Sequence, residues 1–320
     1  MIHTRRRSFA PVHLSPPAKL RLVLLLTLLF ALALPFQPTS AVRVQDEDEV
    51  EKVTSELVVL NVTVTDGQGK FVRKLQRGEF KVFEDGVEQT INTFAREENP
   101  FAAAILIDTS GSMESRVTLA RAAAIIFLGR MRADDVASVY HFHSKVERLQ
   151  DFSNGRDLPP VAYDLRSRGM TRLNDAVLEA AKDLTARPET RRAILLLSDG
   201  SDTQSRSSID TALNAAITAN ATVYTVNMAD PTMNPGRRAA LSAALRKYAE
   251  KSGGRFVDAP GGQALYEAFE QIVEELSNQY TLGYRPSNHT KDGRWRAIEV
   301  RTARTELKTR TRSGYRSPKS

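Results

Sequence analysis

Apolar and polar residues alternate from Leu57 onward in two short stretches of the chain. In the first stretch the apolar members fall at every second position, as Val58, Leu60, Val62 and Val64, before the turn sequence 66–69 and then Phe71-Val72. Residues 80–87 repeat the pattern and contain Asp85-Gly86 as a second tight turn. Alternation interrupted by glycine-containing turns is typical of β-hairpins. Residues 52–98 are therefore predicted to form a small β unit, with too few strands to be stable alone.

Residues 99–279 change to short apolar runs that alternate with longer stretches of helical periodicity. The runs predict strands over 102–107, 136–142, 193–197, 222–226 and 256–257, and the periodic stretches predict helices over 117–131, 173–184, 209–219, 237–251 and 264–276. Continuous apolar runs indicate strands that are buried on both faces. The order of elements predicts an α/β domain with a doubly wound, mostly parallel sheet that helices cover on both sides.

After Gln279 the β pattern returns. Strands are predicted over 280–284, 295–302 and 307–311, followed by a basic stretch over 310–319. The simplest architecture lets the strands of 280–316 complete the N-terminal β unit, so that the α/β domain is inserted in or flanked by a small β-sandwich-like unit. Residues 317–320 are then a short tail, whose basic neighbours are expected to be solvated or to contact an anionic surface.

The N-terminus has the composition of an export signal. Basic residues up to Arg21 precede the apolar run 22–34, which spans roughly 20 Å as a helix and is shorter than a bilayer core of ~30 Å. Small residues at Thr39 and Ala41 suit cleavage after Ala41. Residues 1–41 are predicted to be a cleaved signal peptide and 42–51 an acidic linker, so that the mature chain is exported and has no membrane span. An uncleaved anchor helix is the alternative.

Charge and cysteine content exclude several classes of function. The chain of 320 residues has a net charge of +7, but residues 1–41 carry basic residues only, and the remainder has 40 basic against 38 acidic residues. This balance gives no indication of nucleic-acid binding. The absence of cysteine excludes disulfides, thiolate metal sites and a cysteine nucleophile.

Oxygen-bearing side chains gather where the predicted parallel strands end. The strand 102–107 runs into Asp108-Thr109-Ser110-Gly111-Ser112, and the strand 193–197 runs into Ser198-Asp199-Gly200. A loop with Thr171 lies between them in the sequence. Ligands bind at the carboxyl ends of strands in open α/β sheets, and hydroxyl and carboxylate oxygens suit Mg²⁺ or Mn²⁺. We predict a metal site with the ligands Asp108, Ser110, Ser112, Thr171 and Asp199; the alternative is a helix N-cap cluster.

These motifs resemble the metal-ion-dependent adhesion site of von Willebrand factor A domains over residues 99–279. The flanks 80–86 and 279–286 are similar to those of a bacterial family of exported "VWFA-related" proteins. The resemblance implies a three-layer α/β sandwich, direct ligation by Ser110 and Ser112, and ligation by Thr171 directly or through water. Asp108 and Asp199 would act largely through waters, and an Asp or Glu carboxylate of a protein partner would complete the coordination shell. Met170 departs from the family pattern, in which a second glycine commonly precedes the threonine.

Asp175 and two histidines are further candidates for a chemical role. Asp175 lies one turn into a predicted helix. Its carboxylate is expected either to interact with the positive end of the helix dipole or to support the metal ligands without contacting the ion. His141 and His143 share one face of a strand and are predicted to be exposed, with no third metal ligand visible in the sequence. Binding rather than catalysis is the expected function. The alternatives are Mg²⁺-dependent phosphoester hydrolysis, for which no general base can be named, and a metal-independent scaffold.

Overall fold

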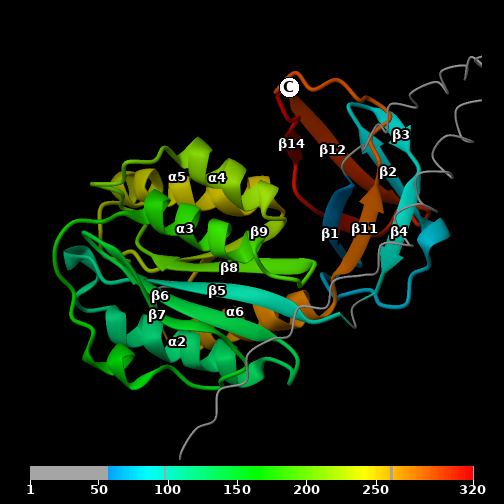
Figure 1. Cartoon of the computed structure of the whole chain (residues 1–320). Helices are drawn as coiled ribbons and strands as arrows, with labels where there is room; N and C mark the ends of the chain where they lie inside the picture. The colour runs from blue at the N-terminus through cyan, green and yellow to red at the C-terminus, as the bar shows by residue number, and fades with distance from the viewer. Residues whose placement is uncertain (1–56, 97–98, 260–261, 320) are drawn as a thin grey trace, which may run out of the picture. The chain divides into compact units, whose positions relative to one another are not determined.

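The computed structural model describes residues 57–96, 99–259 and 262–319, which fall within the unit Thr54–Ser320 (Figure 1). The predicted signal peptide and acidic linker lie outside these residues. Within the described part of the chain, no helix combines the length and apolar character needed to cross a membrane.

One sheet forms the middle layer of the α/β region. Its strands lie in the order β10 (Phe256–Asp258), β9 (Ala221–Asn227), β8 (Arg191–Ser198), β5 (Phe101–Asp108), β6 (Val136–Phe142) and β7 (Val146–Ser153). All neighbouring strands are parallel except β6 and β7, which pair in antiparallel fashion. The predicted mostly parallel sheet is therefore confirmed, with one antiparallel strand at its edge.

Helices cover both faces of this sheet, as Figure 1 shows. On one face lie α2 (Val117–Arg130) and α6 (Gln263–Ser277), and on the other lie α3 (Leu173–Thr185), α4 (Ile209–Thr218) and α5 (Pro235–Ser252). Strand β5 divides its side chains between the two layers. Phe101, Ala103, Ile105 and Ile107 pack in the first core, while Ala102, Ala104 and Leu106 pack in the second. Burial on both faces explains the continuous apolar run of this strand, and the predicted three-layer sandwich is confirmed.

The β unit draws its strands from both sides of the α/β region. One sheet has the order β13 (Lys308–Arg310), β1 (Val58–Thr65), β11 (Tyr280–Tyr284) and β4 (Ile91–Ala95); the other has the order β14 (Gly314–Arg316), β12 (Trp295–Thr302), β2 (Phe80–Glu84) and β3 (Val87–Gln89). A single apolar core joins side chains from both sheets. Strand β1 pairs with β11 from Val58 opposite Tyr284 to Val62 opposite Tyr280, so the α/β region is inserted between paired strands.

Three segments differ from the sequence prediction. Strand β7 was not predicted, because its sequence is mostly polar and it lies at a sheet edge. Phe71 forms only an isolated bridge with Thr65 rather than the second strand of a hairpin. The basic stretch 310–319 is not a solvated tail, since it contains the end of β13 and all of β14.

A buried carboxylate lies where the β unit meets the α/β region. Glu275 of α6 is fully buried and accepts hydrogen bonds from Tyr224 (2.9 Å) and from Thr63 of β1 (3.2 Å). Arg255 lies 3.3 Å from its second oxygen, and Arg310 of β13 also forms an ion pair with it. We call Glu275 and these four partners the junction. The basic residue Arg310 therefore stabilises the fold by pairing with a buried carboxylate.

Candidate functional site

Two neighbouring strands deliver the predicted carboxylates to one edge of the sheet. Strands β5 and β8 are parallel, with Ile107 opposite Leu197. Their last residues, Asp108 and Ser198, therefore lie at the same edge of the sheet. The Ser198 hydroxyl donates to Asp108 Oδ2 at 2.6 Å, and the Ser110 N–H donates to Asp108 Oδ1 at 2.9 Å. Both oxygens of the buried Asp108 thus have fixed partners.

The two serine hydroxyls lie next to each other directly after β5. Ser110 is extended, and Gly111–Met113 form a short 3-10 helix after it, which places the Ser110 and Ser112 Oγ atoms 3.2 Å apart. The side chain of Ser110 does not cap this helix. Ser110 is buried and Ser112 is exposed, so the pair leads from the interior to solvent. The N-cap alternative therefore does not account for these hydroxyls.

Thr171 lies in a loop that backbone contacts hold against the serine motif. Gly111 N donates to Gly169 O at 3.3 Å, and Thr171 N donates to the Thr203 hydroxyl at 2.9 Å. Gly169 has a φ of +74°, a backbone conformation that favours glycine. The side chain of Met170 is half exposed and thus takes little part in the packing of the loop.

Asp199 follows β8 and is almost fully buried, and its Oδ1 accepts from the Ser201 N–H at 2.9 Å. The next residue, Gly200, has a φ of +88°, and a Cβ there would lie 2.2 Å from Leu241 O. Only glycine fits this position. Contacts join Asp108, Ser110 and Ser112 directly, and the strand register brings Asp199 to the same edge. We call these residues, with Thr171, the strand-end site.

The chemistry of the strand-end site suits a small divalent cation. Burial raises the pKa of Asp108 to about 7, the charge of Asp199 adds to the increase, and hydrogen bonds from Ser110 and Ser198 oppose it. A cation nearby would favour the ionised form of such a carboxylate. All candidate donors are hard oxygens, which Mg²⁺ and Mn²⁺ prefer. The residues present therefore fit the ion that the resemblance implies.

Asp175 contacts a loop next to the strand-end site. Its carboxylate accepts from the backbone N–H groups of Arg206 (3.1 Å) and Ser207 (2.9 Å). Partial burial alone would raise the pKa of Asp175, but these N–H donors lower it below its ordinary value. The loop that Asp175 holds includes Thr203, which binds Thr171 N. Asp175 therefore supports the loop rather than only the start of α3.

A second group of potential ligands lies on the hairpin of β6 and β7. His141 and His143 are both 7% exposed, so the expectation that they are exposed was wrong. Glu147 of β7 lies directly opposite His141, and potential ligand atoms of the three side chains lie within 4.8 Å of one another. Sequence reasoning missed Glu147 because it did not predict β7. We call these three residues the histidine cluster.

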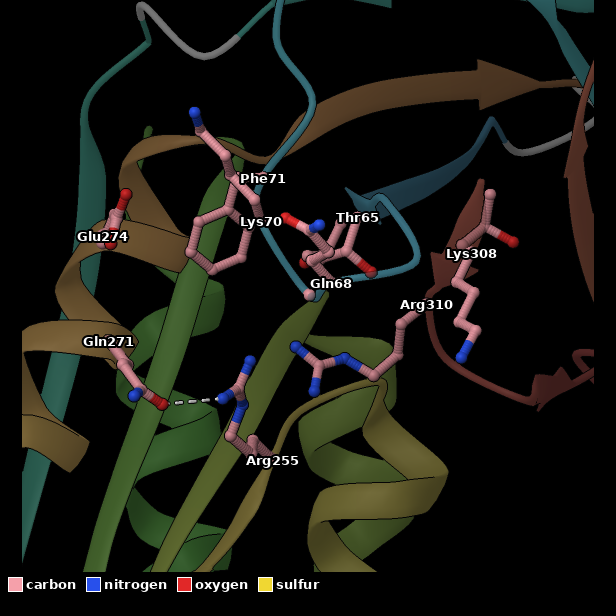
Figure 2. A pocket seen from close by; sticks show the side chains of 12 residues that line it. Thr65, Gln68, Lys70, Phe71, Arg255, Gln271, Glu274, Lys308 and Arg310 are labelled. Carbon is pink, nitrogen blue, oxygen red and sulfur yellow. Dashed lines mark hydrogen bonds between the residues drawn. The ribbon is translucent and has the colours of Figure 1, made fainter. Parts of the chain in front are cut away.

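A hollow lies elsewhere in the described part of the chain, between β13, α6 and the loop after β1. It has a volume of about 680 Å³. Figure 2 shows Arg255 and Arg310 extending into it, with Arg255 bonded to Gln271 at 3.0 Å. Arg255 precedes β10, so the hollow is near the amino ends of the parallel strands. It is therefore distinct from the strand-end site at their carboxyl ends.

Comparison with solved structures finds several matches at low sequence identity. One of them is the PilB minor pilin from Streptococcus sanguinis (16% identity, 56% of this chain and 61% of that chain, TM-score 0.44). The von Willebrand factor domain of the type V pili tip protein Mfa5 from Porphyromonas gingivalis is 14% identical (55% and 94% covered, TM-score 0.46). A von Willebrand factor type A protein from Catenulispora acidiphila is 11% identical (83% and 75% covered, TM-score 0.44).

The chain thus spans less than two thirds of the length of the pilin. No protein with a curated description matches the sequence significantly. The family model described as "VWA domain containing CoxE-like protein" matches residues 77–252, which include β5, β6, β8 and β9 and all residues of the strand-end site. This match covers more than half of the chain, and the protein therefore belongs to the family of VWA domain containing CoxE-like proteins.

Proposed function

We propose that this protein is an exported binding module that uses a divalent cation, Mg²⁺ or Mn²⁺, to capture an acidic group of a protein partner. The observation that carries this proposal is the pair of hydroxyls of Ser110 and Ser112, 3.2 Å apart at the end of β5 and not used to cap the following helix. Export rests on the pattern of residues 1–41 alone.

Each residue of the strand-end site has a distinct task in this proposal. Ser110 and Ser112 hold the ion through their hydroxyl oxygens, and Thr171 completes the protein's share of the ligands. Asp108 and Asp199 balance the charge of the ion and orient its water molecules. Asp108 is already oriented by Ser198 and by the Ser110 N–H, which favours this indirect role.

The partner is expected to offer a carboxylate from Asp or Glu. Neutral hydroxyls leave most of the charge of a divalent ion unbalanced, so an anionic oxygen from outside is a favourable additional ligand. Ser112 is exposed, and this exposure supports access to the ion from solvent.

Binding without turnover is the function that the neighbouring carboxylates support. Phosphoester hydrolysis at the ion would need a general base with a free lone pair near the attacking water. Asp175 is engaged by two backbone N–H groups, and Asp108 is engaged through both of its oxygens. These engagements hold both carboxylates in fixed orientations, which favours support of the loop by Asp175 and orientation of the ion's water molecules by Asp108.

Thermal unfolding with and without metal tests the proposal. At a Mg²⁺ concentration about 100 times Kd, binding adds about 2.7 kcal/mol, which raises Tm by about 5 °C for a chain of this size. The Ser110→Ala protein should lose this increase, while Thr118→Ala, which removes an exposed hydroxyl from α2, should retain it. An equal increase in the Ser110→Ala protein, or none in the wild type, contradicts the metal site.

Two further measurements separate binding from the alternatives. An immobilised acidic peptide should retain the protein with Mg²⁺ and release it with EDTA. If the Ser110→Ala protein keeps its fold but is no longer retained by the peptide in Mg²⁺, this result argues against a metal-independent scaffold. Metal-dependent hydrolysis of a phosphoester that Asp199→Ala abolishes would instead establish the hydrolase alternative.

A further inference from the structure

The histidine cluster has the composition of a transition-metal site. His141 is the last residue but one of β6, His143 lies two residues later, and His143 N donates to Lys145 O at 2.9 Å to close the turn. The pairing places Glu147 opposite His141, with Glu147 Oε2 3.0 Å from His141 Nε2. Two imidazoles and one carboxylate form a common set of three protein ligands for Zn²⁺, which leaves one position open.

The two ring nitrogens of His141 face different groups, with Nδ1 next to Thr109 and Nε2 next to Glu147. The Thr109 hydroxyl lies 3.3 Å from Phe142 O, to which it donates, and 3.1 Å from His141 Nδ1. With its proton on Phe142 O, the Thr109 oxygen accepts from Nδ1–H of His141. In that tautomer the neutral ring presents the Nε2 lone pair toward Glu147, and a metal ion between Nε2 and the carboxylate has a ligand on each side.

His143 provides a second, independent indication. Its ring is almost fully buried, and Nε2 has no hydrogen-bond partner among the described residues. Buried polar atoms are usually satisfied, and an exception indicates a missing ligand. Glu147 is about half exposed through its side chain, so an ion can reach the cluster from solvent.

We propose that His141, His143 and Glu147 bind a transition-metal ion of the Zn²⁺ class, at a site separate from the strand-end site. Imidazole nitrogens favour Zn²⁺ and its neighbours over Mg²⁺, so the two sites differ in the ions that they select. Ligands of a tetrahedral zinc ion lie about 3.3 Å apart, which is close to the 3.0 Å between His141 Nε2 and Glu147 Oε2. Thr109 orients His141 from behind, as supporting groups commonly do for metal-binding histidines.

Binding requires one local change at His143. Its Nδ1 accepts from the Ser144 N–H at 2.6 Å, so the neutral ring carries its proton on Nε2. Ligation through Nε2 moves that proton to Nδ1 and turns the ring away from Ser144 N. The two tautomers of His143 have different ¹⁵N chemical shifts. NMR spectra can therefore detect this exchange of a hydrogen bond for a metal bond.

Zinc titration of the purified, untagged protein tests the proposal. Calorimetry with Zn²⁺ should show one bound ion per chain at this site, and Co²⁺ should give the visible absorption of a four-coordinate complex. His143→Ala and Glu147→Gln should each weaken binding by at least about 100-fold, since removal of a mere supporting group costs 10–100-fold. His289→Ala, which removes an exposed histidine, is the matched control and should leave the affinity unchanged.

The Ser110→Ala protein separates this site from the strand-end site. Zn²⁺ should bind it with wild-type affinity and move the His143 proton from Nε2 to Nδ1 in ¹⁵N spectra. Zinc binding that disappears with Ser110→Ala, or that persists in both His143→Ala and Glu147→Gln, overturns the proposal. Glu147 is exposed, so Glu147→Gln is expected to fold, and its circular dichroism spectrum verifies this.

Discussion

The strand-end site and the junction are both built from buried polar side chains, but they use them in opposite ways. At the junction, Glu275 has hydrogen bonds from Tyr224 and Thr63 and ion pairs with two arginines. At the strand-end site, the hydroxyls of Ser110 and Ser112 lie 3.2 Å apart, and the exposed Ser112 opens the pair toward solvent. Saturated polar groups stabilise a fold, whereas groups with spare lone pairs can bind an ion.

The largest expected effect is at the junction. Glu275→Gln removes the only negative charge that directly contacts both Arg255 and Arg310 within the described junction. Loss of one partner from a buried ion pair costs about 3–5 kcal/mol, which urea unfolding should show as a lower midpoint. Ser110→Ala, measured in EDTA, should cost far less because its hydroxyl is not needed for the fold.

The adjacent residue provides the matched control for this substitution. Glu274 lies on the same helix, but its side chain is 56% exposed. Its ion pair with the equally exposed Arg73 is a long one, at 3.8 Å. Glu274→Gln should change the free energy of unfolding by no more than about 0.5 kcal/mol. Equal effects of the two substitutions would show that burial of the charge at Glu275 is unimportant.

A glycine at the strand-end site should give the next largest effect. Gly200→Ala places a Cβ against Leu241 O at a φ of +88°, and this strain should cost about 2–4 kcal/mol. The displaced loop should also weaken Mg²⁺ binding through Asp199. At Gly111 an added Cβ would lie 3.5 Å from Gly169 O, an ordinary contact. Gly111→Ala should therefore be tolerated, as unfolding and metal titration of both proteins can show.

The smallest expected effect is a pH dependence at Asp175. Because its pKa is lowered in the folded state, its stabilisation is present above the unfolded pKa of about 3.9 and is lost as pH falls through the folded value. Asp175→Asn should cost about 1–2 kcal/mol at pH 7 and less at pH 3, as paired urea titrations can measure. A difference that does not depend on pH would contradict this assignment.

Much of the fold could be predicted because its elements carry local signals. The buried strands β5 and β8 are continuous apolar runs, and α3 and α6 have an apolar face at helical spacing. The carboxylates and hydroxyls of the strand-end site follow these runs directly. Their proximity then depends only on the pairing of neighbouring parallel strands, which is a general property of such sheets.

The missed features depend on contacts between distant or weakly patterned segments. Glu147 became a partner of His141 only through β7, a polar edge strand with little apolar periodicity. Arg310 resembles a tail residue in the sequence, yet it pairs with Glu275 on a different element. Gly111, which lies inside the recognised motif, has ordinary contacts, whereas Gly169 and Gly200 have a positive φ that only the folded loops reveal.

The pairing of β1 with β11 also has a consequence for the order of folding. Strand β1 is synthesised first, but its partner follows the entire α/β region. Closing so long a loop is entropically costly unless the intervening chain is already compact. The α/β region is rich in contacts between successive elements and can form earlier, which brings the two strands together. Until then β1 is an unpaired apolar strand, and a nascent chain in that state is exposed to aggregation.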